Sequence, residues 1–151
     1  MDSITEKATN ALSDLIIINN DRYEGYKKAL EQTESADLKA LFQEYSSDSK
    51  TFGSELRTLL PNYQDAPDRD ETRISGKFYR AWMDVKNALA SNDRKNVLSS
   101  CEFGEDVAKK AYEDALKDRE SLPADTVQII QRQYDDILDA HNRIKALRDS
   151  A

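Results

Sequence analysis

The sequence predicts an all-α fold: an antiparallel four-helix bundle with a long crossover that carries an additional short helix. Three observations support this prediction. Apolar residues recur in steps of three and four through five segments, which is the period of an amphipathic helix. The 151 residues include only 4 Gly and 3 Pro, few for a β-rich fold. The connections between the first two and the last two long segments are short, which favours antiparallel neighbours. We therefore predict a single domain over residues 1–151.

The first helix is expected to begin at Ser3, because Ser3 and Glu6 have the spacing of a capping box. It is expected to end within the sequence QTES, at about residues 31–35. Steps of three and four along this segment predict the residues that face the core. These are Ala8, Leu12, Leu15, Asn19, Tyr23, Tyr26 and Leu30.

The second helix is expected to begin after Ser35, a residue type that can cap a helix N-terminus with its side chain. Asp37 lies in the first turn, where the helix dipole favours negative charge. Pro61 is expected to stop the helix, since proline cannot continue it. The predicted core positions are Leu38, Phe42, Tyr45, Ser49, Phe52, Leu56 and Leu59.

The connection after this helix is predicted to contain a loop at residues 61–71, which is rich in proline and aspartate, and then a helix at residues 72–90. Trp82 is expected to anchor that helix to the bundle, with exposure on a dimer surface as the alternative. The apolar stripe of this helix consists of Ile74, Phe78, Trp82, Val85 and Leu89.

The last two helices are predicted on either side of Pro123, which suits the first turn of the final helix. Ser91 or Asn92 is expected to cap the helix before it. The core positions of that helix are predicted to be Val97 or Leu98, Cys101, Glu105, Ala108, Tyr112 and Ala115. Those of the final helix are predicted to be Val127, Ile130, Tyr134, Ile137, His141, Ile144 and Leu147.

Each long helix has one polar residue within its apolar stripe. Buried polar groups are costly unless they are hydrogen-bonded, so they tend to meet one another. We hypothesise that Glu105 and His141 face each other in the interior, within a buried polar layer that also holds Asn19 and Ser49. Glu105 is then a metal ligand, a proton donor, or a structural acid that is hydrogen-bonded by His141, Asn19 or a tyrosine hydroxyl. The structural role is favoured because buried polar groups commonly fix the register of bundles.

The composition excludes several classes of protein. A net charge of −7 opposes non-specific binding to nucleic acid, which needs basic patches. The longest apolar run, LIII at residues 15–18, is far shorter than the roughly 20 residues that span a membrane. The acidic, polar start MDSITEKATN predicts no signal peptide. Cys101, the single cysteine, is expected to be a buried hydrophobic residue in a reducing compartment. These observations predict a cytoplasmic protein.

Four segments resemble one family of bacterial ferritin-like bundles of unknown function. They are LSDLIIINNDRYEGYKKAL, YRAWMDVKNAL, CEFGEDVAKKAYEDAL and QRQYDDILDAHNRIKALRD. The resemblance covers essentially the whole chain. The resemblance implies a bacterial protein with a ferritin-like bundle, but it does not imply a function, since one fold serves many.

The same resemblance implies where two metal ions would bind. Ferritin-like enzymes supply one glutamate from each of two helices and a Glu-x-x-His pair from each of the other two. Only two of the six corresponding positions, Glu105 and His141, hold residues of the ligand types. The other four positions are Asn19, Ser49, Phe52 and Leu138. One carboxylate and one imidazole cannot complete two coordination spheres, so a dimetal centre of the usual kind is expected to be lost.

Three functions remain open from the sequence. The first and favoured one is a non-catalytic bundle that acts through protein–protein association, as a homo-oligomer or with another protein, but with neither nucleic acid nor membrane. The second is a degenerate ferritin-like protein that binds one metal ion, iron or manganese, or a small molecule in the core through Glu105 and His141. The third is an enzyme of unrelated chemistry, for which the sequence supplies no complete catalytic constellation.

Overall fold

The computed structural model describes residues 3–60 and 76–151, with side chains at residues 6–60 and 80–151. These residues are all-helical, and no strand occurs among them. Four of the elements are long helices, one is a shorter α-helix, and one is a single 3-10 turn. In chain order they are α1 (Ser3–Gln32), α2 (Ala36–Thr58), α3 (Gly76–Ala90), α4 (Arg94–Lys117), η2 (Arg119–Ser121) and α5 (Ala124–Asp149).

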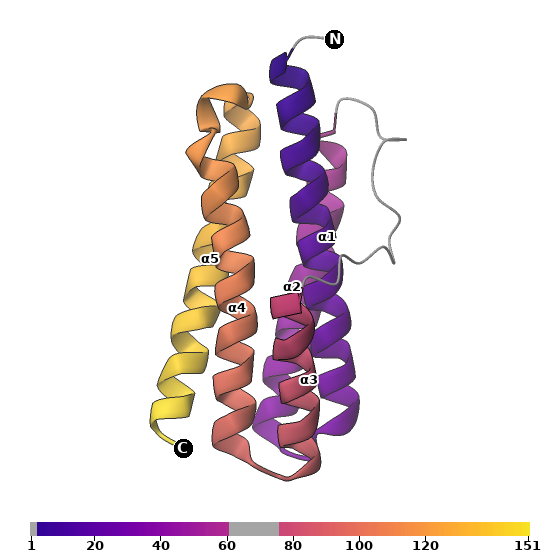
Figure 1. The fold of residues 1–151 in the computed structure, drawn as a ribbon, viewed down its shortest axis with the longest axis vertical. Helices are drawn as coiled ribbons and strands as arrows, with labels where there is room; N and C mark the ends of the chain where they lie inside the picture. Colours follow the sequence, from indigo (N-terminus) through magenta and orange to yellow (C-terminus); the bar gives the residue numbers. More distant parts are fainter. Residues whose placement is uncertain (1–2, 61–75) are drawn as a thin grey trace.

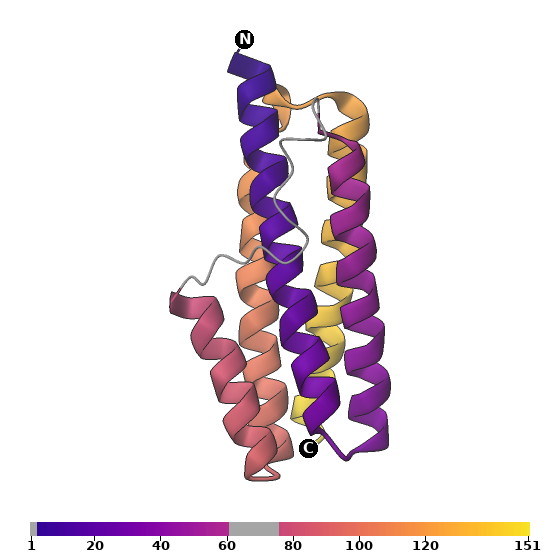
Figure 2. The same cartoon turned by 90° about the vertical axis from the view of Figure 1, so that its right-hand side faces the viewer.

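The four long helices lie side by side as two antiparallel pairs (Figure 1). Helices α1 and α2 form one pair and α4 and α5 the other, whereas α2 and α4 run in the same direction. The shorter helix α3 packs on α4 and α1, and it covers only the half of them nearer to the α3–α4 turn (Figure 2). Within the described ranges, no helix is long and apolar enough to span a bilayer.

The predicted helices are largely confirmed. The structure begins α1 at Ser3 and ends α3 at Ala90, as predicted. The loop at residues 61–71, with Pro61, and the first residues of the predicted crossover helix lie outside the described residues. The side chains of Ser3 and Phe78 and all of Ile74 also lie outside the described residues. The predicted capping box and part of the predicted α3 stripe therefore lie outside them as well.

One predicted helix cap is confirmed in its position but not in its hydrogen bond, and another is wrong. Ser35 occupies the N-cap position of α2, but its hydroxyl makes no capping bond and instead donates to Asp37 Oδ1 at 2.5 Å. Asp93, not Ser91 or Asn92, caps α4, where its carboxylate accepts from the Asn96 backbone N–H at 3.2 Å. Asn92 has a φ of 58°, the left-handed conformation that a tight turn requires and that asparagine tolerates better than most residues.

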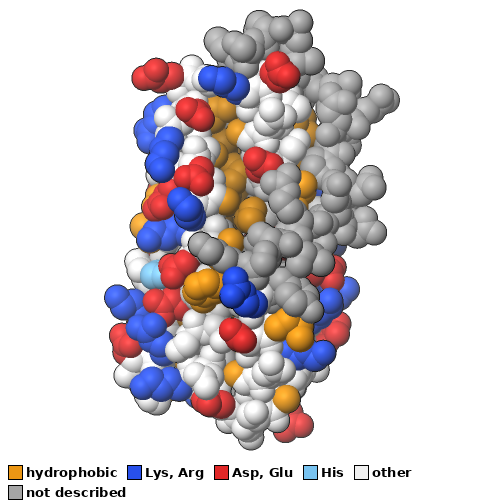
Figure 3. Space-filling view, in the orientation of Figure 1, with side chains coloured by type: hydrophobic (Ala, Val, Ile, Leu, Met, Phe, Trp, Pro, Cys, Tyr) orange, Lys and Arg blue, Asp and Glu red, His pale blue; other side chains and the backbone are white. Residues whose placement is uncertain are grey.

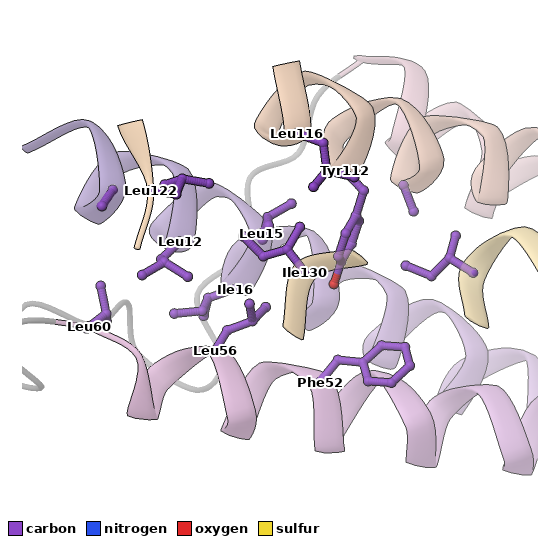
Figure 4. Packing of buried hydrophobic residues seen from close by; sticks show 13 residues of the cluster. Leu12, Leu15, Ile16, Phe52, Leu56, Leu60, Tyr112, Leu116, Leu122 and Ile130 are labelled. Carbon is purple, nitrogen blue, oxygen red and sulfur yellow. The ribbon is translucent and has the colours of Figure 1, made fainter. Parts of the chain in front are cut away.

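The hydrophobic core forms two clusters along the bundle. One lies towards the end where α1 begins and α4 ends, and Figure 4 shows its side chains converging from α1, α2, α4 and α5. The other, which includes Tyr26, Phe42 and Val85, lies towards the α1–α2 and α3–α4 turns. Cys101 is fully buried in this second cluster, as predicted.

Helix α3 is anchored by Trp82, as predicted. Its ring meets the ring of Tyr26 edge to face, with 4.8 Å between ring centroids. The indole also lies directly over Gly25 of α1 and within contact of Gly104 of α4. Two helices that present glycine therefore allow α3 to approach closely.

The turn end of the bundle carries an ion pair that links α2 to α4. Arg94 Nη1 donates to Asp37 Oδ1 at 3.1 Å. The hydrogen bonds from Arg94 and then Ser35 hold the pKa of the Asp37 carboxyl well below its usual range. Both side chains are more than a third exposed, so solvent screens the pair and limits its contribution to about 1 kcal/mol or less.

This ion pair gives a pH-dependent prediction. A lowered folded-state pKa stabilises the fold above the unfolded pKa of about 3.9, and the stabilisation is lost as the pH falls below that value. Asp37→Asn is therefore expected to lower the free energy of unfolding slightly at pH 7, with the difference from the parent protein shrinking below about pH 4. Urea unfolding at a series of pH values measures this. Arg94→Gln should show the same trend, and a difference that grows on acidification would contradict it.

Candidate functional site

The centre of the bundle holds a buried ion pair between α1 and α4. Glu105 is 1% exposed and Arg22 is 2% exposed. Arg22 Nε donates to Glu105 Oε1 at 2.8 Å, and the Tyr26 hydroxyl donates to the same oxygen. Glu105 thus occupies the predicted core position, but its partner is an arginine one turn before Tyr26 on α1.

Arg22 extends this network to α2. Its Nη1 donates to Ser49 Oγ at 2.9 Å, and the Ser49 hydroxyl donates to the Tyr45 backbone carbonyl at 2.7 Å. The guanidinium carbon also lies 5.4 Å and 5.5 Å from the ring centroids of Tyr26 and Tyr45, within the range of a cation–π interaction. One arginine therefore ties three helices together.

The Arg22 guanidinium stays charged despite its burial. Burial acts to lower the pKa of the Arg22 guanidinium, but the negative charge of Glu105 acts to raise it, and the net shift is upward. Burial, followed by the charge of Glu105, raises the pKa of Tyr26 well above its usual value, so its hydroxyl keeps its proton and remains a donor. The arrangement is a closed, internally neutralised centre.

A second buried network joins all four long helices. Asn19 Nδ2 donates to Leu15 O and to the Tyr112 hydroxyl, each at 2.8 Å. The Tyr112 hydroxyl donates to Gln133 Oε1 at 2.7 Å, and Gln133 Nε2 donates to Phe52 O at 3.3 Å. Figure 4 shows the Tyr112 hydroxyl pointing into the space between the helices. Such networks favour one register of the helices over others.

Two buried acceptors are left over in these networks. Glu105 Oε2 and Asn19 Oδ1 accept no hydrogen bond from the described residues. Unsatisfied buried acceptors are uncommon, and a buried water molecule often serves them. Neither acceptor makes the centre a cation site, because the Arg22 guanidinium already neutralises Glu105.

The predicted contact between Glu105 and His141 is wrong. The two side chains make neither a hydrogen bond nor an ion pair with each other. His141 is 13% exposed on the flank between α4 and α5, where its Nε2 lies 2.7 Å from Asp106 Oδ1 and 3.6 Å from Glu102 Oε1. The reason is a shift of one residue, because the buried face of α5 passes through Ala140 rather than His141.

The rest of the predicted polar layer is buried, but it divides in two. Ser49 joins Glu105 through Arg22, whereas Asn19 belongs to the Tyr112 network. Arg22 and Gln133 were not predicted from the sequence to be core residues. A strict alternation of four-residue and three-residue steps between core positions would have predicted both. It places Arg22 after Asn19 on α1, and Gln133 after Ile130 on α5.

Cys101 provides no nucleophile to this site. It is fully buried, and burial followed by the charge of Glu105 raises the pKa of its thiol. The thiolate is the reactive form of cysteine, so this residue is expected to be unreactive.

The fold and the site define an all-helical protein with a closed core that is cross-linked by hydrogen bonds. The chain belongs to the family described as Domain of unknown function (DUF2383), whose model matches residues 7–118, well over half of the sequence. The matched part contains the Arg22–Glu105 ion pair and ends before α5. No curated protein matches the chain.

Proposed function

We propose that this protein is a non-catalytic, ferritin-like helical bundle that acts through protein–protein association, with a second copy of itself as the partner. The observation that carries the non-catalytic part of the proposal is the Arg22–Glu105 ion pair. It fills the interior with a fixed cation, where a metalloenzyme of this architecture would need a cage of free carboxylates. The single cysteine and acidic composition support the bacterial cytoplasm as its location.

The direction of the helices supports the ferritin-like part of the proposal. Two antiparallel pairs with a long crossover between them are one of the known arrangements of four-helix bundles, and ferritin-like folds have one such crossover. Here α2 and α4 run in the same direction, and α3 belongs to the connection between them (Figures 1 and 2).

The buried positive charge of Arg22 argues against metal-dependent catalysis in the core. A divalent ion at Glu105 would have to displace Arg22 Nε from the Oε1 atom or lie beside a buried positive charge. The two like charges would repel each other strongly in a medium of low dielectric constant. Iron or manganese bound through Glu105 and His141 is the weaker alternative, because these side chains belong to separate clusters.

The surface supports association. Among the described side chains, Phe103 is the one large hydrophobic residue that is exposed, at 46%. It lies on α4, one turn before the half-buried Val107. Figure 3 shows a strip of hydrophobic side chains between α1 and α4, in the half of the molecule that α3 leaves uncovered. Exposed apolar surface of this kind is a common mark of a protein–protein contact.

Sedimentation velocity tests self-association through this surface. The protein is expected to form dimers as its concentration rises from about 1 μM to 1 mM, the range in which weak interfaces assemble. Phe103→Ser is expected to raise the dissociation constant at least tenfold. Asp139→Ser, at an exposed position on α5, is the matched control and should leave the dimer unchanged. A chain that stays monomeric throughout this range would overturn the proposal.

A further inference from the structure

We propose that Glu102, Asp106 and His141 form a binding site for one divalent transition-metal cation, which would bridge α4 and α5. The site lies outside the core and does not depend on the Arg22–Glu105 ion pair. It is also independent of the proposed self-association, so the two proposals can fail separately.

The helices place three ligand atoms together. Glu102 and Asp106 are four residues apart on α4, which puts their side chains on one face of the helix. His141 reaches them from α5, with its Nε2 2.7 Å from Asp106 Oδ1 and 3.6 Å from Glu102 Oε1. The three ligand atoms all lie within 4.8 Å of one another. Ligands about 2.0–2.2 Å from one zinc ion are roughly 3–4 Å apart, so small side-chain rotations suffice.

The imidazole is oriented for this role. Its Nδ1 lies 3.3 Å from Asn142 Oδ1, which can accept a hydrogen bond from a proton on that nitrogen. This leaves Nε2 facing two carboxylates. A cation placed between Nε2 and the two carboxylates would accept a lone pair from each of these three groups. This directional nitrogen distinguishes the site from an ordinary patch of surface acids.

Arg148 holds one ligand in position. Its Nη1 donates to Glu102 Oε2, so Glu102 Oε1 is the oxygen turned towards His141. Outer partners of this kind orient metal ligands and tune their affinity. Asp106 is about half exposed, so water could complete the coordination on the open side.

The donor set selects the class of cation. One imidazole with two carboxylates suits Zn²⁺, Fe²⁺ or Mn²⁺, whereas Ca²⁺ and Mg²⁺ prefer oxygen ligands alone. Three protein ligands with an open position also match the coordination that zinc adopts in many non-structural sites. Zn²⁺ is therefore the probe that the geometry favours.

Isothermal titration of chelator-treated protein with Zn²⁺ tests the site. We expect one ion per chain, and at least a tenfold weaker affinity in His141→Asn and in Asp106→Asn. Asp114→Asn is the matched control, because it removes an exposed α4 carboxylate outside the cluster. The melting temperature of the parent protein should rise with Zn²⁺, since a ligand of the folded state stabilises it, and this rise should be lost in both site variants.

Glu105→Gln separates this proposal from metal binding in the core. The lateral site predicts that this variant binds Zn²⁺ as the parent does. Loss of binding in folded Glu105→Gln, with binding intact in Asp106→Asn, would overturn the proposal in favour of the core. Absence of stoichiometric binding, or equal affinity in the parent and both site variants, would also overturn it.

Discussion

Replacing Arg22 with methionine is expected to lower the free energy of unfolding by about 3–5 kcal/mol, the usual cost of leaving one partner of a buried ion pair without the other. Glu105 is 1% exposed and would lose the one cationic partner that it has among the described residues. The Ser49 hydroxyl would also lose the guanidinium donor. Urea unfolding followed by circular dichroism measures this change, since loss of the helices reports global unfolding.

The double variant Arg22→Met/Glu105→Leu is the control for this prediction. Well-packed apolar residues often replace a buried ion pair with little loss of stability. We therefore expect the double variant to recover much of the stability that Arg22→Met loses. If Arg22→Met costs less than about 1 kcal/mol, or if the double variant is less stable than the single one, the ion pair does not stabilise the centre of the bundle as proposed.

The sequence was sufficient to predict the helices, because their apolar periodicity is strong and their ends are marked by turn residues. It also placed Glu105 correctly, since the neighbouring positions Cys101, Ala108 and Tyr112 are all buried on the same face of α4. A glutamate among such residues has no other face to occupy. The identity of its partner was harder to predict.

Arg22 escaped prediction because arginine is usually a surface residue, and because the apolar stripe of α1 was continued through Tyr23 instead. The structure leaves Tyr23 half-buried and buries Arg22 fully. Steps of four can replace steps of three at any turn, so a period of 3.6 residues leaves a choice between adjacent positions. Residue type then decides which of the two positions is assigned to the core, and here it favours Tyr23 over Arg22, which is the buried residue.

The same ambiguity misplaced His141. On α5 the buried residues Ile137, Ala140 and Ile144 keep the alternation of three and four, whereas the predicted stripe passed through His141. The small side chain of Ala140 gives a weak apolar signal beside a histidine. Packing between the helices determines which of the two residues faces the core, and the periodicity of one helix alone does not. This shift of one residue changes the partners of the imidazole, which lies beside Glu102 and Asp106 instead of Glu105.

Gly25→Ala is expected to displace Trp82 and to lower the free energy of unfolding by about 1–3 kcal/mol, the usual cost of overpacking. A methyl group at Gly25 would overlap the indole ring of Trp82. The ring must then leave its edge-to-face contact with Tyr26. Trp82 is the only tryptophan, so its fluorescence reports the change directly, and we expect its emission to shift to longer wavelength.

Gly104→Ala is the matched control on the other helix that Trp82 touches. Its added methyl would lie 3.6 Å from Trp82 Cζ2, an ordinary contact. Because alanine favours a helix over glycine by about 0.5–1 kcal/mol, this variant should be as stable as the parent or slightly more so. Equal losses in the two variants would show that the close approach at Gly25 does not hold α3 in place.

The Gly25 variant also tests whether the crossover helix and the core act together. Tyr26 contacts Trp82 with its ring and Glu105 with its hydroxyl, so it joins α3 to the ion pair. If Tyr26 moves when Trp82 is displaced, the ion pair is already weakened in Gly25→Ala. Arg22→Met should then cost less in that background than in the parent, by more than the roughly 0.5 kcal/mol scatter of independent sites. Additive losses would mean that α3 covers the bundle without supporting its centre.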